Sequence, residues 1–378
     1  MEEATTYKLG DISTMKYGKL PPKYINEGNY PIWSGYRYVG KCNEFNCNKG
    51  DIIIVARGVG GTGDVKIAKE DCYLTNLSIQ VKLDKNICQP EYFYYSYLLS
   101  NLKYLDSGSA QSQITIEDLK RLEVTLPPLE QQHKITDILK SIDEKIELNR
   151  QINDNLEQQA QALYKSWFVD FEPFKDGEFI ESELGKIPEG WQCIPFSMFV
   201  SESKAKTGKI GIKEYSVTNN GIFPRDAKYN KSLSQSSTKN KLILYGDLVF
   251  GMSRDILNWG VMQEEQGGVS SAYTVYNINS GIVTSTYLEL FIKSRIHLFS
   301  DLIRPAAREG QGIDKSVLQT KVLLYPPHEV LDTFWPLYNS VTNQIQRTTT
   351  EINCLGDVRD TFLPKLMSGE LKINDLDC

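Results

Sequence analysis

Residues 58–63 (Gly-Val-Gly-Gly-Thr-Gly) fit the glycine pattern of a dinucleotide-binding loop. Such a loop needs a helix directly after it, because the helix N-terminus holds the phosphate. Residues 64–69 instead alternate polar and apolar side chains, which predicts a strand. The glycines are therefore predicted to form a turn between two strands.

Two proline pairs, Pro127-Pro128 and Pro326-Pro327, lack the polar partner that adenine methylation requires. An adenine methyltransferase holds a flipped base with a short acidic or amide residue before such a pair and an aromatic residue after it. Here leucine and tyrosine precede the prolines, and leucine and histidine follow them. The pattern argues against methyl transfer by this chain.

Metal and nuclease motifs are also incomplete. His133, His297 and His328 are far apart and have no partners at metal-ligand spacing. The seven cysteines include no Cys-x-x-Cys pair, which argues against a zinc site and indicates a reducing compartment. Asp143-Glu144-Lys145 resembles part of a nuclease site, but we expect it on the solvent face of a helix. We predict no catalytic residue, no metal and no cofactor bound by this chain.

Length and composition predict a globular protein with two or more domains. The 378 residues exceed the size of one domain of about 100 to 200 residues. The polar N-terminus and the lack of a run of about 18 apolar residues predict no signal peptide, no membrane span and a cytoplasmic location. The net charge of −6 is unevenly distributed: basic and acidic residues balance in 1–128 (15 each), whereas basic residues exceed acidic ones in 185–327 (17 against 12). Nucleic-acid binding is therefore not excluded.

The sequence repeats itself internally. An offset of 199 residues aligns the two proline pairs and continues through the segment after each of them. An offset of 196 aligns Gly50-Asp51 with Gly246-Asp247, each of which opens a predicted strand. The predicted order is a globular domain at 1–128, a helix at 129–168, a linker at 169–186, a second domain at 187–327 and a helix at 328–378.

Both predicted helices carry apolar residues at steps that alternate four and three, which is the pattern of a coiled-coil seam. A helix over 129–168 would be about 60 Å long. Asn149 and Asn153 fall in the seam, where they either fix the pairing register or face solvent where the helices separate. The expected seam residues are Ile135, Leu139, Ile142, Ile146, Asn149, Asn153, Leu156, Leu163, Trp167, Tyr338, Val341, Ile345, Ile352, Leu355, Phe362 and Leu366. We predict an α+β fold with two mixed α/β domains separated by two long helices in an antiparallel coiled coil, related by an internal pseudo-twofold repeat.

Polar side chains in loops between strands are the candidates for contacts with DNA bases. Each of them could instead support a turn or face solvent, so the set carries more weight than any member. The first-domain candidates are Ser34, Tyr36, Arg37, Arg57, Asn76, Gln111 and Gln113. The second-domain candidates are Thr218, Asn219, Arg225, Ser253, Arg254, Ser270, Tyr273, Arg304, Arg308 and Gln311.

Four segments resemble the specificity subunit of Type I restriction-modification systems, and the resemblance covers nearly the whole chain. They are LeuProProLeuGluGlnGln at 126–132, LysSerTrpPhe at 165–168, IleProGluGlyTrp at 187–191 and PheLeuProLysLeuMetSerGlyGluLeu at 362–371. The sequence departs from the family pattern after the second proline pair, where HisGluVal replaces LeuGluGln.

The resemblance implies a non-catalytic subunit with two target-recognition domains, each recognising half of a bipartite site in double-stranded DNA. It implies two methylation subunits, which carry S-adenosylmethionine and dock on the helices, and a restriction subunit that joins for cleavage. The alternatives are a stand-alone DNA methyltransferase or nuclease, and a coiled-coil adaptor whose domains bind protein.

Overall fold

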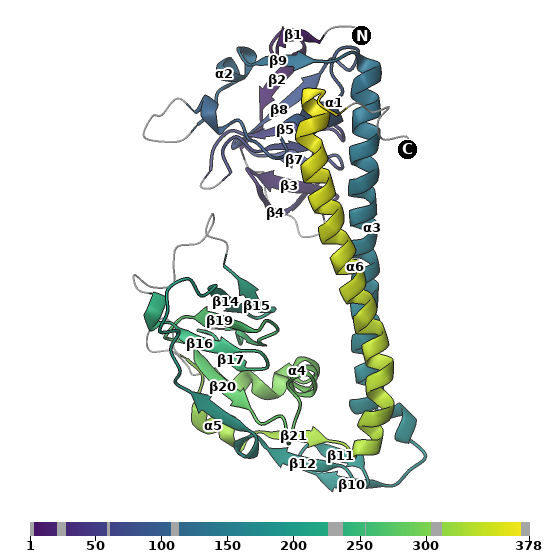
Figure 1. The fold of residues 1–378 in the computed structure, drawn as a ribbon, viewed down its shortest axis with the longest axis vertical. Helices are drawn as coiled ribbons and strands as arrows, with labels where there is room; N and C mark the ends of the chain where they lie inside the picture. Colours follow the sequence, from purple (N-terminus) through teal and green to yellow (C-terminus); the bar gives the residue numbers. More distant parts are fainter. Residues whose placement is uncertain are drawn as a thin grey trace. The chain divides into compact units, whose positions relative to one another are not determined.

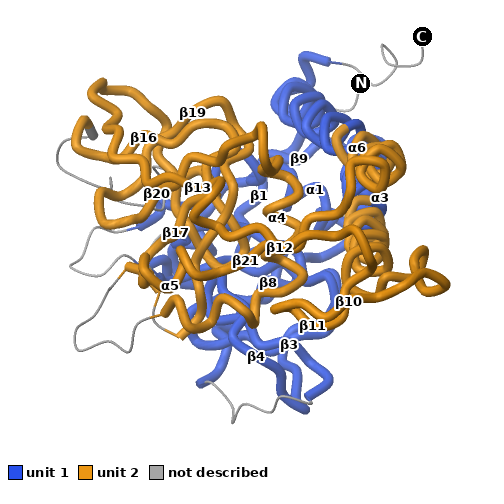
Figure 2. Tube along the Cα trace, turned by 90° about the horizontal axis from the view of Figure 1, so that it is seen from below, with its two compact units in different colours: residues 1–152, 347–378 blue, residues 153–346 orange. Residues whose placement is uncertain are grey.

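The computed structural model describes residues 4–20, 28–58, 61–106, 113–225, 237–253, 255–303 and 312–371. The chain divides into two compact units. Unit 1 combines Met1–Ile152 with Arg347–Cys378, and unit 2 is Asn153–Gln346 (Figure 2). Each unit therefore contains parts of both long helices.

Unit 1 is built on a four-stranded antiparallel sheet in the order β2-β8-β5-β6. Figure 1 labels β2, β8 and β5 of this sheet. Its strands are β2 (Ser13–Tyr17), β5 (Ile52–Val55), β6 (Val65–Ile67) and β8 (Ser78–Leu83). The inner strand β5 pairs with β6 and β8 on its two edges, and all of its residues are buried. Gly50 has a φ of +85°, which glycine adopts without strain, and its turn leads the chain into β5.

The other elements of unit 1 surround this sheet. They are β1 (Thr5–Lys8) paired with β9 (Glu123–Leu126), the sheet β4 (Arg37–Cys42), β3 (Tyr30–Ser34) and β7 (Tyr73–Leu74), and the helices α1 (Pro90–Ser96) and α2 (Ile116–Lys120). Thr115 caps α2 by accepting a hydrogen bond from the Asp118 backbone N–H, and the Asp118 carboxylate accepts one from the Thr115 backbone N–H in return.

Unit 2 repeats this arrangement. Its four-stranded sheet has the order β13-β20-β17-β18, formed by β13 (Val200–Ser203), β17 (Leu248–Phe250), β18 (Trp259–Val261) and β20 (Thr274–Ile278). β12 (Gln192–Pro195) pairs with β21 (Val322–Tyr325), and α4 (Ser285–Ser294) and α5 (Lys315–Thr320) match α1 and α2 in order. In each unit, equivalent elements therefore follow one another in the same chain order around a four-stranded sheet of the same topology.

The units differ in the strands added to this common frame. Unit 2 has the hairpin β14 (Tyr215–Thr218) and β15 (Gly221–Pro224), and the pair β16 (Lys241–Leu244) and β19 (Gln266–Val269). Short 3-10 helices lie at Lys103–Leu105, Glu172–Phe174, Phe196–Met198, Ser237–Lys239 and Ile296–Leu302.

Residues 169–186, expected to be a linker, carry local structure. They contain β10 (Phe179–Ser182), which pairs with β11 (Gly185–Pro188). The Phe171 and Phe174 rings lie 5.4 and 5.3 Å from the Trp191 ring, centroid to centroid. These aromatic contacts hold the segment against the core of unit 2.

The long helices are α3 (Leu129–Phe168) and α6 (His328–Ser368). α6 begins at the residue equivalent to the start of α3, 199 positions later, although HisGluVal replaces LeuGluGln there. In unit 1, Asp143 pairs with Arg359 at 2.8 Å and Lys145 pairs with Glu351 at 3.3 Å. The later residue of α3, Lys145, pairs with the earlier residue of α6, Glu351, so the two helices run antiparallel. The predicted α+β fold with two long antiparallel helices is confirmed.

Every expected seam residue is buried or half-buried. Ile135 and Leu139 of α3 join Leu363 and Leu366 of α6 in the core of unit 1. In unit 2, the Trp167 ring of α3 lies 5.7 Å from the Phe334 ring of α6. The helices are therefore part of both cores rather than a separate rod.

Asn149 is 2% exposed, so it packs inside the seam instead of facing solvent. Its Nδ2 has no hydrogen-bond partner in the described part of the chain. Asn153 is half-buried.

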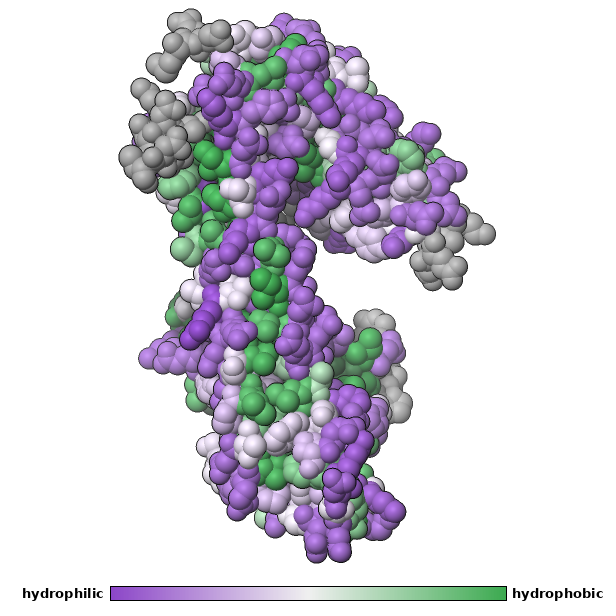
Figure 3. All heavy atoms as spheres, turned by 90° about the vertical axis from the view of Figure 1, so that its right-hand side faces the viewer, coloured by the Kyte–Doolittle hydropathy of each residue, from purple (hydrophilic) through white to green (hydrophobic). Residues whose placement is uncertain are grey.

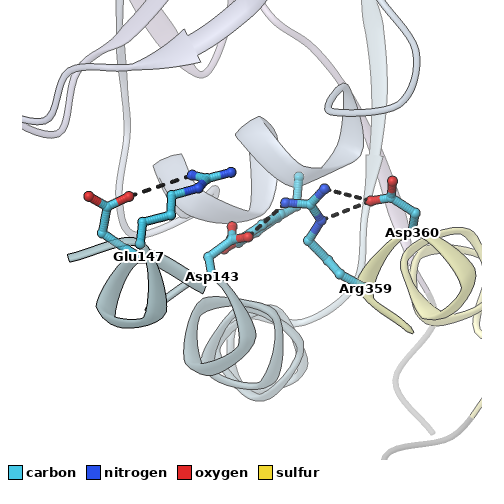
Figure 4. A network of polar contacts seen from close by, with 6 residues as sticks. Asp143, Glu147, Arg359 and Asp360 are labelled. Carbon is cyan, nitrogen blue, oxygen red and sulfur yellow. Dashed lines mark hydrogen bonds and ion pairs between the residues drawn. The ribbon is translucent and has the colours of Figure 1, made fainter. Parts of the chain in front are cut away.

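Polar contacts attach the first sheet domain to the helices. Arg359 of α6 donates to the carboxylates of Asp143 and Asp360, both at 2.8 Å (Figure 4). Tyr95 of α1 donates its hydroxyl to Asp143, also at 2.8 Å. The solvent face expected for Asp143 is thus wrong, because its carboxylate joins three elements of unit 1.

A buried glutamine closes the junction between this domain and α3. Gln132 is 0% exposed, and its Nε2 donates to the carbonyls of Ile87 (2.9 Å) and Pro127 (2.8 Å). Its Oε1 accepts from the backbone N–H of Gln89 at 2.9 Å. The last residue of the 126–132 motif therefore bonds three backbone groups.

Candidate nucleic-acid interface

Arg57 lies at the centre of the candidate residues of unit 1, just after the end of β5. Its backbone pairs with Gln113, and the preceding residue Ala56 accepts a hydrogen bond from the Ile114 N–H at 3.0 Å. The Arg57 side chain is half-buried, and its Nε has no hydrogen-bond partner in the described part of the chain. An arginine guanidinium can donate two parallel hydrogen bonds to paired acceptor atoms, such as those of a guanine edge.

The turn between β3 and β4 lies against Arg57. Gly35 has a φ of +60° in this turn, and a Cβ built there would lie 3.4 Å from the Arg57 carbonyl oxygen. Ser34, before the glycine, accepts a hydrogen bond from the Thr75 hydroxyl at 3.2 Å. Asn76 follows Thr75 and precedes Leu77, whose carbonyl accepts from the Arg57 N–H at 3.2 Å.

Tyr36 and Arg37 follow Gly35 and form a cationic edge. Arg37 Nε donates to the Tyr36 hydroxyl at 2.9 Å, and its guanidinium carbon lies 5.1 Å from the Tyr36 ring centroid. Lys66 donates to the Tyr36 carbonyl at 3.4 Å, and burial lowers the pKa of its amine. The structure therefore gathers Ser34, Tyr36, Arg37, Arg57, Asn76 and Gln113 at one end of the first sheet. Gln111 lies outside the described residues.

The candidates of unit 2 are more dispersed. Thr218 and Asn219 form the turn between β14 and β15, where Thr218 accepts from the Asn220 N–H at 3.1 Å. Arg225 follows β15, and its Nη1 donates to the Ser216 hydroxyl at 2.7 Å. These residues belong to one added hairpin.

Ser253 supports a turn. It is 8% exposed, and its hydroxyl accepts from the Asn258 N–H at 2.9 Å. At an offset of 196 it occupies the position that Arg57 holds in unit 1. In this structure the Ser253 hydroxyl therefore supports a turn.

Ser270 and Tyr273 lie on a loop that borders a polar pocket. The Ser270 hydroxyl accepts from the Ala272 N–H at 3.3 Å, and Tyr273 lines the pocket together with Lys241 and Lys315. Arg254, Arg304, Arg308 and Gln311 lie outside the described residues.

Sequence reasoning missed the lysines Lys66, Lys241 and Lys315. Lys241 is the first residue of β16, and a lysine at a strand end has the pattern of an ordinary surface residue. Its partner Tyr273 is 32 residues away, so only the tertiary fold brings the two together.

Within the described ranges, no group of three or more His, Cys, Asp or Glu side chains is placed to hold a metal ion. None of the helices found in those ranges combines the length and the apolar character needed to cross a membrane.

Comparisons with known proteins agree on one family. A family model described as the Type I restriction modification DNA specificity domain matches residues 1–158. The chain is 27% identical over 373 residues to the Type I restriction enzyme MjaIX specificity subunit of Methanocaldococcus jannaschii, covering 93% of this chain and 84% of that protein. It is 22% identical to the MjaVIII specificity subunit of the same organism, covering 100% and 95%.

A solved structure has a similar fold. The crystal structure of a Type I restriction-modification S subunit from M. genitalium superimposes with a TM-score of 0.58 at 15% identity, covering 96% of both chains.

Proposed function

Since the chain belongs to the family of Type I restriction-modification specificity subunits, which are themselves non-catalytic, we propose that it selects the DNA sequence on which its complex acts. Each unit binds one half of a bipartite site in double-stranded DNA. The long helices set the gap between the halves.

The observation that carries this proposal is the internal repeat with unequal additions. Both units have a four-stranded sheet of the same strand order, which serves as a common frame. The residues gathered around Arg57 in unit 1 differ in type from those around the pocket of unit 2. Two frames of one kind with different polar residues suit the recognition of two different half-sites.

The chain is part of a Type I complex, and we assign its partners from the same premise. Two methylation subunits carry S-adenosylmethionine and dock on the helices, and a restriction subunit joins for cleavage. Hydrophobic surface runs along the helices in Figure 3. Leu148 and Ile152 lie one turn apart on α3 of unit 1 and are 53% and 40% exposed, which fits a partner surface. The complex acts in the cytoplasm, where it meets DNA.

Exchanging residues 1–128 for the equivalent segment of another family member tests this proposal. The exchange should change one half of the methylated site and leave the other half and the gap unchanged, because each unit carries its own sheet and loops. Sequencing of methylated adenines in cells carrying the chimera measures the outcome. A simultaneous change of both halves would contradict recognition by separate units.

A further inference from the structure

A pocket of about 500 Å³ lies in unit 2, bordered by Lys241, Tyr273, Thr274, Gly312 and Lys315. The pocket is formed by the start of β16, the loop before β20 and the segment leading into α5. None of its polar side chains belongs to the hairpin that carries Thr218 and Asn219.

Among the described residues that line the pocket, the two charged ones are both lysines. Lys241 and Lys315 border it directly, and Lys204 is close enough for its charge to act on Lys241. One carboxylate, Glu202, pairs with Lys315 at 2.5 Å. The Asp314 carboxylate accepts hydrogen bonds from the backbone N–H groups of Ser316 (2.9 Å) and Val317 (3.3 Å) at the start of α5.

Lys241 is the central cation of this group. Its side chain is half-buried, and its ammonium donates to the Tyr273 carbonyl at 2.5 Å. An ammonium has three donors, so further donors remain for a ligand. Burial lowers the pKa of the Lys241 amine, and the charges of Lys315 and Lys204 add to this, whereas Glu202 opposes it. A bound anion would offset both the burial and the repulsion.

The pocket contains the residue of unit 2 that is equivalent to a backbone partner of Arg57 in unit 1. Gly312 is the equivalent of Gln113 at an offset of 199, and Gln113 pairs with the backbone of Arg57. At an offset of 196, Ser253 is the equivalent of Arg57. Both units therefore have a cation near this equivalent position. In unit 1 it is Arg57, which follows β5, and in unit 2 it is Lys241 of the added strand β16.

We propose that this pocket binds one backbone phosphate of the DNA in the second half-site and contributes affinity without base recognition. A lysine presents a compact point charge, whereas base recognition relies on the paired donors of arginine or an amide. Phosphate contacts fix the position of a protein on the duplex and carry no sequence information directly. This inference rests on the proposed function.

The test measures binding of the full-length chain, assembled with its methylation subunits, to a duplex with its recognition site and to a random duplex. Replacing Lys241 with Gln should weaken both complexes by the same factor. Each phosphate contact contributes about 0.9 to the slope of log affinity against log salt. The loss caused by Lys241→Gln should therefore shrink about 3.5-fold between roughly 50 and 200 mM salt. Lys241→Arg should retain most of the slope.

Two further variants guard against a folding defect. Gly312→Asp keeps every lysine and places a negative charge at the pocket, where the residue borders the Thr274 hydroxyl, so it should also weaken both complexes. Lys213→Gln is the matched control, because Lys213 is exposed, lies in the same unit and pairs with Glu264 at 3.1 Å. It should leave the slope unchanged.

An unchanged slope in folded Lys241→Gln and Gly312→Asp variants would overturn the inference. A loss confined to the recognition-site duplex would make Lys241 a base contact instead. Stabilisation of the wild type by inorganic phosphate, with no effect of the variants on DNA binding, would assign the pocket to a small phosphate ligand. If the wild type itself prefers no sequence, the proposed function fails rather than this inference.

Discussion

Arg57 is the base contact that we propose for unit 1. Its backbone lies beside Gln113 and the Gly35 turn, and its N–H donates to the carbonyl of Leu77, the residue after Asn76. A bidentate arginine contact discriminates a guanine by about 1–3 kcal/mol.

Arg57→Ala should weaken binding to the recognition site by about 1–3 kcal/mol and relax discrimination in one half-site only. Competition binding against single-base variants of the site measures this. Arg57→Lys keeps the charge but not the fork of donors, so it should also lose discrimination. Equal losses on specific and random DNA would identify Arg57 as a phosphate contact.

At the scale of elements, the Asp143 carboxylate joins α3, α6 and α1. The Asp143 and Arg359 side chains are 29% and 22% exposed, so solvent screens the pair less than an ordinary surface pair. Neither Asp143 nor Arg359 has a charged counterpart in unit 2, because Thr342 and Ala160 occupy the equivalent positions. Unit 2 therefore cannot form this ion pair at the equivalent positions.

Asp143→Ala should reduce the free energy of unfolding by about 1–2 kcal/mol, because Tyr95 loses its acceptor and Arg359 keeps only Asp360. A double-mutant cycle with Arg359→Ala isolates the pair, with urea unfolding as the measurement. Arg150→Ala is the matched control, since it removes an exposed pair with Glu147 at 3.6 Å, and it should change stability by less than about 0.5 kcal/mol. Equal effects of the two substitutions would contradict the role of Asp143.

The helices also allow a test of the gap. Inserting one heptad after Asn149 and one after Thr348 keeps the seam register and lengthens each helix by about 10 Å. If the helices run nearly parallel to the DNA axis, this equals about three base pairs at 3.4 Å each, and about 100° of rotation. Methylation of sites with stepped gaps should show a new preferred gap or weaker activity.

A two-residue insertion at the same points is the control, because it breaks the register of the seam. It should lower stability or prevent assembly with the methylation subunits. A stably assembled heptad variant that keeps its original gap at full strength would show that the helices do not set the spacing.

At the scale of the whole chain, buried tyrosines link stability to pH in both units. Burial raises the pKa of Tyr92 in unit 1, and of Tyr276 and Tyr338 in unit 2, to about 12. In the unfolded chain tyrosine ionises near pH 10. The folded state holds these protons more tightly, so stability is intact below about pH 10 and falls as the pH rises towards 12.

Unfolding by urea at about pH 8 and about pH 11 should therefore show a clear loss of stability at the higher pH. Tyr276→Phe is a suitable control, because the Tyr276 hydroxyl has no hydrogen-bond partner in the described part of the chain. The variant should be near wild-type stability at neutral pH and lose less of it in alkali. Titration of every tyrosine near pH 10, followed by absorbance, would contradict the expectation.

The parts of the structure that depend on local pattern could be predicted from the sequence. The proline pairs and the heptad spacing located the start of α3 at Leu129 and its end at Phe168, because helix periodicity and proline restrictions act over a few residues. Asp143 could not be placed this way, since its partner Arg359 is 216 residues away. The contact of Lys241 with Tyr273, 32 residues away, could not be predicted for the same reason. The turn hydrogen bond of Ser253 leaves no distinct sequence signal either.

The division of α6 between the units has a consequence for biosynthesis. Leu363 and Leu366 belong to the core formed by the N-terminal sheet, together with Leu119 and Ile135. A ribosome releases these leucines only after the whole of unit 2 has been translated, so the first unit to be started is the last to be completed. Until then its core stays open along the side that α6 covers. A nonsense mutation shortly before Leu363 would accordingly damage the domain at the beginning of the chain, while every residue of unit 2 would still be made.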